Sequence, residues 1–526
     1  MATNGDDCAI TQAVAYFVNA IGKKISKQVP GMKAACEAWL SEEEGNKDGD
    51  TTMKSNLEKN QDVKSVVLDE TPWVSRALSE SNRRHALIDF FDTQKQTSRE
   101  RDIIEKLRAL QQGDGLFTWW PGMLGSEYVT SAVCKLLVRS RHMTAEDSRT
   151  TEMLDKAAPA MYSTLSRRVK EMKKWSKENK TEPGVSDWTC DLLYTLSMYN
   201  EGKWPANMVA DRDYMLKLLS KSSKGLTIYG KANIGTIFLL NGQEKEAQKF
   251  VKSIREYTVM TEEKGRFFNT HKAQYTWQDY RIPSQVAAIE AMTRITPDDQ
   301  QTISELQRWL LQEKRTTMWS TNLTSAEAVY AFVLNHLDAF VAAPSEITVD
   351  GRKIEGGSTA LIGYTKERMS GEGVREVRIE KQGEGTSWGA VYAQFTQDID
   401  KIESSSTGIS VTREVLGDSH AVGDKVRVRI TIECDRDYDF VQVIDHRAAC
   451  MEPVEQSSGY RRGCYVAPRD RKTEYFFDRL GKGRHVIETE YYIDRAGNYQ
   501  VGTCEAQCAY SPEFAGRSGG MRIEVK

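Results

Sequence analysis

The chain has 526 residues, of which 28% are charged, and its 72 Lys and Arg residues nearly balance its 75 Asp and Glu residues. Because this length exceeds one ordinary core, we expect two to four domains. The balanced charge argues against nucleic acid as a partner, since phosphate binding normally requires a basic excess. The sequence has no apolar run long enough to span a bilayer, and its first residues do not resemble an export signal.

Helical periodicity of apolar residues extends from Val14 to about His336. Clear examples are Val14, Phe17, Val18 and Ile21; Val129, Val133 and Leu136; and Ala326, Val329, Tyr330 and Val333. Each set marks one helix face, and turn signals such as Asn241-Gly242 separate the sets. Many helices joined by short turns must bury these faces against one another, and a fixed solenoid repeat is missing, so we predict an α/α toroid. We interpret the charged stretch 42–69 as an excursion from the ring.

After Asp338 the periodicity changes from helical to alternating. Residues 425–433 alternate strictly between polar and apolar, and 409–415 and 521–525 follow the same pattern. This alternation predicts half-buried strands, and the glycine-rich turns between them favour an antiparallel β-sandwich. We expect the helical region to end near Pro344 and a second break near 404–406. The predicted fold class is therefore multidomain, α then β, with a toroid followed by antiparallel β-sandwich domains.

Five of the nine cysteines lie in the last hundred or so residues: Cys434, Cys450, Cys464, Cys504 and Cys508. We expect disulfides there, with free buried thiols or a metal site as alternatives. Cys504 and Cys508 are four residues apart on an expected strand, so they face the same side and could pair with cysteines of facing strands. We predict Cys450 with Cys508 and Cys464 with Cys504, although spacing alone does not fix connectivity.

The most aromatic stretch of the chain lies in the loop 113–123. There, Trp119 and Trp120 precede Pro121-Gly122, a pair that favours a sharp turn. We predict that both rings point inward and pack at the mouth of the toroid. The alternative is an exposed platform for a sugar or a peptide.

No side-chain constellation in the sequence is typical of an enzyme, and we expect neither a cofactor nor a metal. The histidines lack the pairing of a zinc hydrolase, and nucleophile-elbow and phosphate-loop motifs are missing. Residues of the kind that a polysaccharide lyase uses do occur in 267–283, where His271, Tyr275, Tyr280 and Arg281 lie close together. Such a lyase, or another glycan-active enzyme of toroid and sandwich architecture, is the alternative function.

A series of motifs along the chain is similar to those of the bacterial alpha-2-macroglobulins. They are Glu70-Thr-Pro-Trp73, the loop 113–123, and the segments 309–314, 388–392, 445–450, 477–480, 494–497 and 510–514. The resemblance implies a thioester-type toroid over 1–340, a connecting, partly CUB-like β domain over 341–402, and a terminal macroglobulin-like sandwich over 403–526. It also implies upstream macroglobulin domains in a longer precursor, export to the periplasm or cell envelope, often as a lipoprotein, and proteases as partners.

Covalent trapping in this family needs a thioester between the Cys and Gln of a Cys-Gly-Glu-Gln-type motif. The corresponding place here is Cys8-Ala-Ile-Thr-Gln12, which is one residue longer and lacks the Gly and the Glu. On a helix the extra residue rotates Gln12 by about 100° relative to Cys8, so the two groups do not meet as in the family. We therefore predict a protease inhibitor of bacterial defence that is not an enzyme and that traps by conformational change without a thioester.

Overall fold

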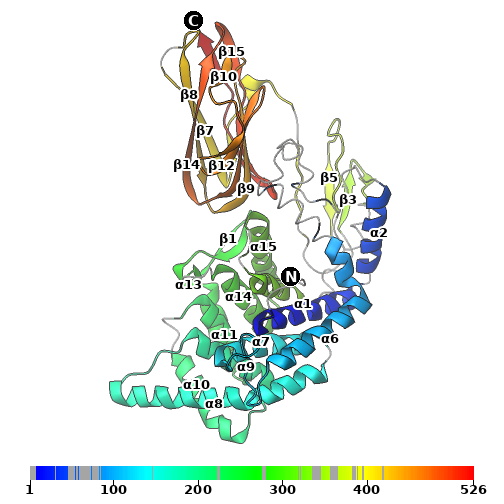
Figure 1. Ribbon diagram of the computed structural model, residues 1–526, viewed down its shortest axis with the longest axis vertical. Coiled ribbons are helices and arrows are strands. Elements are labelled where there is room, and N and C mark those ends of the chain that lie inside the picture. The colour runs from blue at the N-terminus through cyan, green and yellow to red at the C-terminus, as the bar shows by residue number, and fades with distance from the viewer. Residues whose placement is uncertain are drawn as a thin grey trace.

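A helical region precedes antiparallel β-sheets in the computed structural model of the protein (Figure 1), as the sequence predicts. The structure describes residues 7–29, 31–45, 54, 57, 73, 82, 85–144, 146–221, 226–274, 280–317, 319, 321–334, 345–355, 365–381, 387, 389–393, 396–417 and 420–526. The excursion expected at 42–69 and the boundary expected at Pro344 lie almost entirely outside these residues. None of the described helices is long and apolar enough to cross a membrane.

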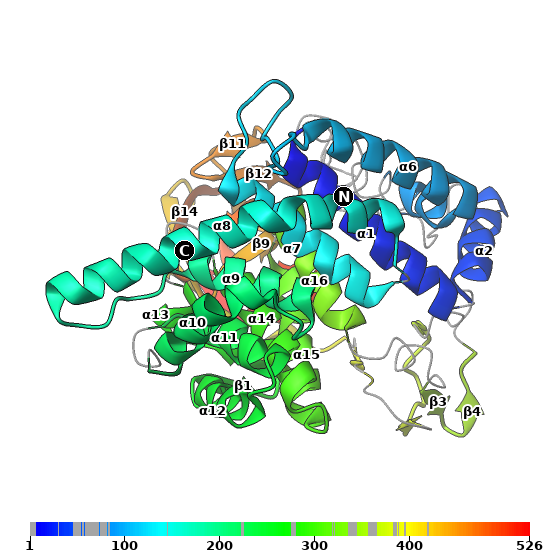
Figure 2. The same cartoon turned by 90° about the horizontal axis from the view of Figure 1, so that it is seen from below.

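The helices form a closed ring with an inner and an outer layer. The inner helices are α1 (Ala9–Gln28), α7 (Glu127–Met143), α9 (Asp187–Asn200), α11 (Ile228–Leu240), α14 (Arg281–Ile295) and α16 (Asn322–Val333). Each inner helix packs against the next, and α16 packs against α1, which closes the ring. This is the predicted α/α toroid. Figure 2 shows the ring from below, with α6 beside α1 and α8 across the outside.

Outer helices connect consecutive inner ones and cover them. They are α6 (Thr93–Leu110), α8 (Ser148–Asn179), α10 (Val209–Lys221), α12 (Glu244–Arg255) and α15 (Gln300–Thr316). Shorter or flanking elements are α2 (Gly31–Gly45), η1 (Ala206–Met208), β1 (Thr258–Thr261), β2 (Gly265–Phe268) and α13 (His271–Gln274). The outer helix α12 is strongly amphipathic and buries only Ala247, Phe250, Val251 and Ile254, whereas α11 is buried on all sides from Ile228 to Phe238.

Polar residues set where the inner helices begin. The side chains of Ser126, Ser186, Thr227 and Thr321 each accept a hydrogen bond from the backbone amide three residues later, at the starts of α7, α9, α11 and α16. Such caps satisfy amides that have no partner within the helix. The helix starts are therefore specified locally, and the ring then brings them together.

The β region begins with a small sheet. Its strands are β3 (Glu346–Val349), β4 (Arg352–Lys353) and β5 (Val377–Glu380), in the order β4-β3-β5, and η3 (Ile399–Lys401) follows. The terminal region is built from β6 (Ser405–Thr407), β7 (Ile409–Leu416), β8 (Lys425–Cys434), β9 (Tyr438–His446), β10 (Met451–Pro453), β11 (Gly459–Arg461), β12 (Cys464–Pro468), β13 (Lys472–Leu480), β14 (Gly483–Ile493), β15 (Gly497–Val501), β16 (Cys504–Cys508), β17 (Ser511–Arg517) and β18 (Met521–Val525).

The described strands of the terminal region form an 11-stranded antiparallel sheet in the order β10-β14-β8-β7-β6-β17-β16-β9-β13-β12-β11, and β15 pairs with β18. Alternating residues of β8 are buried, as the sequence pattern predicts. One core joins Val428 and Ile430 of β8 to Val441 and Val443 of β9 and Phe477 of β13. The two halves of the sheet therefore face each other across this core, as in a sandwich.

All nine cysteines are free and buried, so the predicted disulfides Cys450–Cys508 and Cys464–Cys504 are not formed. Cys464 lies on β12 and Cys504 on β16, with β13 and β9 between them in the sheet. Three strand spacings amount to about 14 Å, whereas disulfide-linked Cα atoms are at most about 7 Å apart. In the sheet, Cys508 of β16 lies opposite Val441 in the middle of β9. Cys450 lies in the turn after β9, so the two cysteines are not neighbours in the sheet.

Candidate functional site at the mouth of the helical ring

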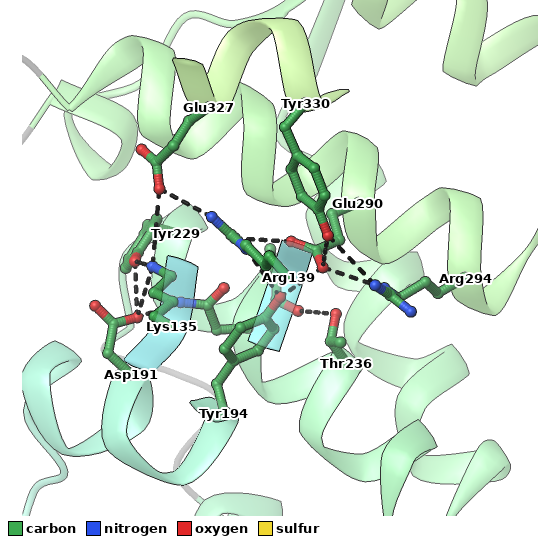
Figure 3. A network of polar contacts seen from close by, with 12 residues as sticks. Lys135, Arg139, Asp191, Tyr194, Tyr229, Thr236, Glu290, Arg294, Glu327 and Tyr330 are labelled. Atoms are coloured by element: carbon green, nitrogen blue, oxygen red, sulfur yellow. Dashed lines mark hydrogen bonds and ion pairs between the residues drawn. The ribbon is translucent and has the colours of Figure 1, made fainter. Parts of the chain in front are cut away.

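The inner helices run parallel, so their N-terminal ends meet at one mouth of the ring. Their polar side chains form two layers, one helical turn apart. The layer nearer the mouth contains Lys135, Asp191, Tyr229 and Glu327, and the deeper layer contains Arg139, Tyr194, Glu290, Arg294 and Tyr330 (Figure 3). In α7, α9 and α16 the step from the first layer to the second is three or four residues in the same direction, as parallel helices require.

Cys8 and Gln12, the place of the family's thioester, lie at the start of α1. Cys8 is the N-cap: its Sγ accepts a hydrogen bond from the Thr11 amide at 3.4 Å and lies 3.1 Å from Thr11 Oγ1. The backbone amide of Gln12 donates to the Cys8 backbone carbonyl at 3.0 Å, and the side chains of Cys8 and Gln12 are both buried. The thiol therefore caps the N-terminus of the helix, a role that a Ser, Thr or Asp side chain usually has.

The aromatic loop lies directly beside Cys8. The amide of Ala9 donates to the Trp119 carbonyl at 3.0 Å. The Trp119 ring stacks on Trp120 at 5.7 Å and on Tyr128 at 6.0 Å between ring centres, with interplanar angles of 24° and 23°. Two features that the sequence indicates separately, Cys8 and the loop, are thus neighbours at the mouth.

The prediction that both tryptophans point inward is wrong for Trp120. Trp119 is half-buried against the ring core, but Trp120 is 44% exposed. Trp119 already occupies the space against the core, so Trp120 can stack only on its outer side. Tyr128, Met123 and Leu124 are also exposed there, which leaves an aromatic and apolar surface next to the mouth.

Asp191 is the centre of the outer polar layer. Its Oδ1 accepts hydrogen bonds from Tyr229 Oη at 2.7 Å and Asn233 Nδ2 at 2.9 Å, and it lies 3.4 Å from Lys135 Nζ. Lys135 Nζ also donates to Tyr229 Oη at 2.6 Å and lies 4.0 Å from a Glu327 oxygen. Each charge in this layer therefore faces an opposite charge or a hydroxyl group.

Asp187 lies one turn nearer the mouth than Asp191. Burial, together with the neighbouring Asp191 charge, raises the pKa of Asp187, although hydrogen bonding from Thr227 opposes the shift. A Cβ atom at Gly230 would lie 2.8 Å from Asp187 Oδ1, so glycine leaves room for this carboxylate. A carboxylate with a raised pKa can act as a proton donor or acceptor, but it also occurs in purely structural networks.

Glu290 is the centre of the deeper layer. Arg139 donates to Glu290 Oε2 at 2.8 Å and to Glu327 Oε1 at 2.9 Å, while Tyr330 and Arg294 contact Glu290 Oε1 at 2.9 and 3.1 Å. Burial alone would raise the pKa of Glu290, but Arg139 and Arg294 outweigh it and lower the pKa to about 2. The side chains of Arg139 and Glu290 are each 1% exposed. A buried and fully paired network of this kind holds helices in register.

The lyase-type residues are only partly described. Tyr275 lies outside the described residues. His271 is the first residue of α13, but its side chain is not described. Burial and the Asp191 charge raise the pKa of Tyr280 to about 12, which makes this phenol a poor base at neutral pH. Arg281 pairs with Glu313 at 3.3 Å. Within the described residues no group of His, Cys, Asp and Glu side chains could hold a metal ion.

The network residues were not found by sequence reasoning, although a signal existed. Lys135 and Arg139 are four residues apart and interrupt the apolar face of α7, and Glu290 interrupts a run of small apolar residues in α14. Charged residues at positions that helical periodicity assigns to a core usually have a buried partner of opposite charge. The sequence could not identify those partners, because they lie on helices far apart in the chain.

Comparison with known proteins gives one family match. Residues 399–513 match the family model of the bacterial alpha-2-macroglobulin MG10 domain. The match confirms the expected resemblance to the bacterial alpha-2-macroglobulins and covers most of the terminal sandwich. Comparison with curated proteins gives no match.

Solved structures of bacterial alpha-2-macroglobulins also match most of the chain. The trypsin-activated protein from Escherichia coli is 12% identical, with a TM-score of 0.45, over 82% of this chain and 30% of that chain. The same protein activated by porcine elastase is 13% identical, with a TM-score of 0.41, over 82% and 39%. The Salmonella protein reacted with methylamine is 13% identical, with a TM-score of 0.33, over 82% and 28%. This chain therefore spans less than half the length of these structures.

Proposed function

Starting from the resemblance to the bacterial alpha-2-macroglobulins, we propose that the chain is part of a protease inhibitor that traps its target by conformational change and without a covalent thioester. The observation that carries the proposal is the MG10 match of residues 399–513 downstream of a closed helical ring. In this proposal the chain is not an enzyme, and it acts in the periplasm or cell envelope together with upstream macroglobulin domains. The proposed domains are 1–340, 341–402 and 403–526.

The contacts of Cys8 support the thioester-free part of the proposal. The Cys8 side chain is a free thiol whose Sγ accepts a hydrogen bond from the Thr11 backbone amide as a helix cap. A thioester would require the Gln12 carboxamide carbon to bond to the Cys8 sulfur with loss of ammonia. Because one residue more separates Cys8 from Gln12 than in the family motif, we expect the two groups not to meet in the geometry that the family's thioester requires.

Treatment with methylamine tests this point. We expect no mass gain on the intact chain and no change in titratable thiols, because an amine has no activated carbonyl to attack. Cys8→Ser, which can cap the helix in the same way, is the matched control and should behave like the wild type. A gain of one methylamine together with release of a thiol at Cys8, absent from Cys8→Ser, would show a thioester and exclude the proposed mechanism.

Mixing a protease with the longer protein that includes the proposed upstream macroglobulin domains tests the partner class. We expect a complex that survives gel filtration but separates in denaturing detergent, because the contact is not covalent. Catalytically inactivated protease is the control: trapping that begins with cleavage should be lost with it. An adduct stable to detergent, or equal binding of the active and the inactivated protease, would contradict this mechanism.

The glycan-active alternative has less support. Among its candidate bases, the structure describes the side chain of Tyr280, whose pKa is raised to about 12, and Arg281 is already paired with Glu313. A carboxylate-neutralising group needs a guanidinium that the substrate can reach. We therefore do not adopt the alternative.

A further inference from the structure

The ring and the terminal sandwich touch through a set of ion pairs that we call the ionic latch. It consists of Lys264 and Arg315 from the ring and of Asp435 and Glu513 from the sandwich. Arg315 donates to both carboxylate oxygens of Glu513, at 2.6 and 3.1 Å. A third pair, Glu313 with Arg436 at 3.8 Å, joins the same two parts but is not counted with the latch, because its side chains are only 4% and 11% exposed. Lys264 pairs with Asp435. Opposite charges therefore face each other across the interface.

Most of the latch remains in contact with water. The side chains of Arg315 and Glu513 are 37% and 22% exposed, and those of Lys264 and Asp435 are 22% and 36% exposed. A groove runs between the two parts, lined by Glu263 and Lys264 of the ring and by Gly408 and Phe514 of the sandwich. Ion pairs at this level of exposure are screened by salt, and water can replace each partner.

A second contact, which we call the aromatic anchor, has the opposite chemistry. Trp73, which belongs to the chain between α2 and α6 of the ring, packs on the sandwich and is only 2% exposed. Its ring meets Phe440 at 5.3 Å and Phe476 at 5.2 Å between centres, both edge to face. Leu57, from the same part of the chain, is fully buried in this cluster. Apolar contacts of this kind are not weakened by salt.

The backbone of the sandwich is adapted to the anchor. Phe440 has a φ of 56°, a left-handed conformation that is unfavourable for an aromatic residue. The residue leaves the regular pairing of β9 with β13, and its side chain joins Trp73 rather than the sandwich core. Strain of this kind persists where surrounding contacts enforce it. Trp73 Nε1 is buried and has no hydrogen-bond partner among the described residues, and the contacts that the structure shows for this ring are aromatic.

From these contacts we propose that the sandwich is fastened to the ring by an ionic latch that opens in salt and by an aromatic anchor that, like the buried Glu313–Arg436 pair, does not. Opening the latch then lets the sandwich shift against the ring while Trp73 and the Glu313–Arg436 pair keep it attached. The inference rests on the contacts alone and does not depend on the proposed protease inhibition.

The distance between ring and sandwich in the full chain tests this proposal. Spin labels are attached to cysteines introduced at two exposed sites, Lys249→Cys on α12 and Val486→Cys on β14, while the native thiols are all buried. Between 0.1 M and 1 M salt the Debye length falls from about 10 Å to about 3 Å. We expect one short distance at low salt and an additional, longer distance whose population increases several-fold at high salt.

Two variants separate the latch from the anchor. Glu513→Gln should produce the longer distance already at low salt, because it removes the charge that Arg315 binds. Its control is Glu490→Gln, which removes a similarly exposed ion pair with Lys425 inside the sandwich and should leave the distances unchanged. Equal distances at both salt concentrations, or no difference between these two variants, would overturn the latch.

Trp73→Ala should broaden the distance distribution only when the latch is also open, at high salt or with Glu513→Gln. Trp175→Ala, at an exposed tryptophan of α8, is the control. If Trp73→Ala disturbs folding, as judged by circular dichroism, Trp73→Phe keeps a smaller ring in place and should give an intermediate breadth. A Trp73 variant that folds and shows the same narrow distances as the wild type at high salt would overturn the anchor.

Discussion

The centre of the ring and the ionic latch each contain an Arg–Glu ion pair, but the two pairs differ in burial. The Arg139–Glu290 pair at the ring centre is 1% exposed on both sides, whereas the Arg315–Glu513 pair of the latch is 37% and 22% exposed. Removing one partner at the centre leaves a charge that water cannot reach, but removing one partner in the latch leaves a charge that water solvates. Burial, rather than the distance between the charges, therefore decides whether an ion pair fixes a structure or allows it to open.

The largest effect should come from the ring centre. We expect Arg139→Ala to lower the free energy of unfolding by about 3–5 kcal/mol, because Glu290 is left buried without its main partner. Urea unfolding followed by the helical circular dichroism signal measures this change. Arg315→Ala is the comparison on the exposed side. A loss below about 1 kcal/mol for Arg139→Ala would mean that the buried pair at the ring centre contributes no more to stability than an exposed ion pair does.

Acid should weaken the ring through Glu290. Its pKa is lowered from the usual value of about 4.5 to about 2, because Arg139 and Arg294 outweigh the effect of burial. A lowered pKa contributes stability that is present above the unfolded value and is lost as pH falls towards the folded value, here from about 4.5 to about 2. The full contribution is about 3 kcal/mol.

Urea midpoints at pH 6 and pH 3 for the wild type and Glu290→Gln measure this contribution. The variant should be less stable at pH 6, and its midpoint should fall less between the two pH values. Parallel decreases for both proteins would assign the acid sensitivity to other carboxylates.

The aromatic loop should show a smaller, graded effect. We expect Trp119→Ala to cost about 2 kcal/mol, about half of what truncating a fully buried aromatic residue costs, because its ring is half-buried. Trp120→Ala should cost less than about 1 kcal/mol, since the ring is largely in solvent. Thermal unfolding of the two single variants measures the difference, and equal losses would indicate that Trp120 packs as deeply as Trp119.

The smallest effect on stability should come from the latch itself. We expect Glu513→Gln to change the free energy of unfolding by less than about 1 kcal/mol in 0.1 M salt, because exposed ion pairs contribute little. In 1 M salt the difference from the wild type should disappear, since screening weakens the wild-type pair as well. A larger loss of unfolding free energy that persists in 1 M salt would show that Glu513 stabilises the fold in the same way as the buried pairs of the ring centre.

The order of the fold could be predicted from the sequence because periodicity is a local property. Alternation at 425–433 predicted β8, and the apolar sets at Val129 and at Ala326 predicted α7 and α16. The depth of Trp120 and the cysteine pairing were not predictable in the same way. Both depend on which strands or side chains become neighbours, and spacing along the chain does not determine that.

The signature around Asp445-His-Arg447 shows what such a motif does physically. Asp445 forms a buried pair with Arg413 at 2.9 Å. The guanidinium of Arg447 donates to the carbonyls of Met451 and Lys472 at 3.1 and 2.9 Å, so it binds two neighbouring turns together. In the sequence these residues carry part of the family resemblance, and in the structure they hold the end of the sandwich together.

The parallel inner helices have an electrostatic consequence for the mouth of the ring. Every α-helix carries a partial positive charge of about half an elementary charge at its N-terminal end. Because the inner helices all begin at the same mouth, these partial charges add up there. Asp187, the first residue of α9, lies in this positive field, whereas Asp191 and Glu327 lie beyond the first turns of α9 and α16, where the field has weakened. The field favours a charged Asp187 and so opposes the effect of burial on its pKa.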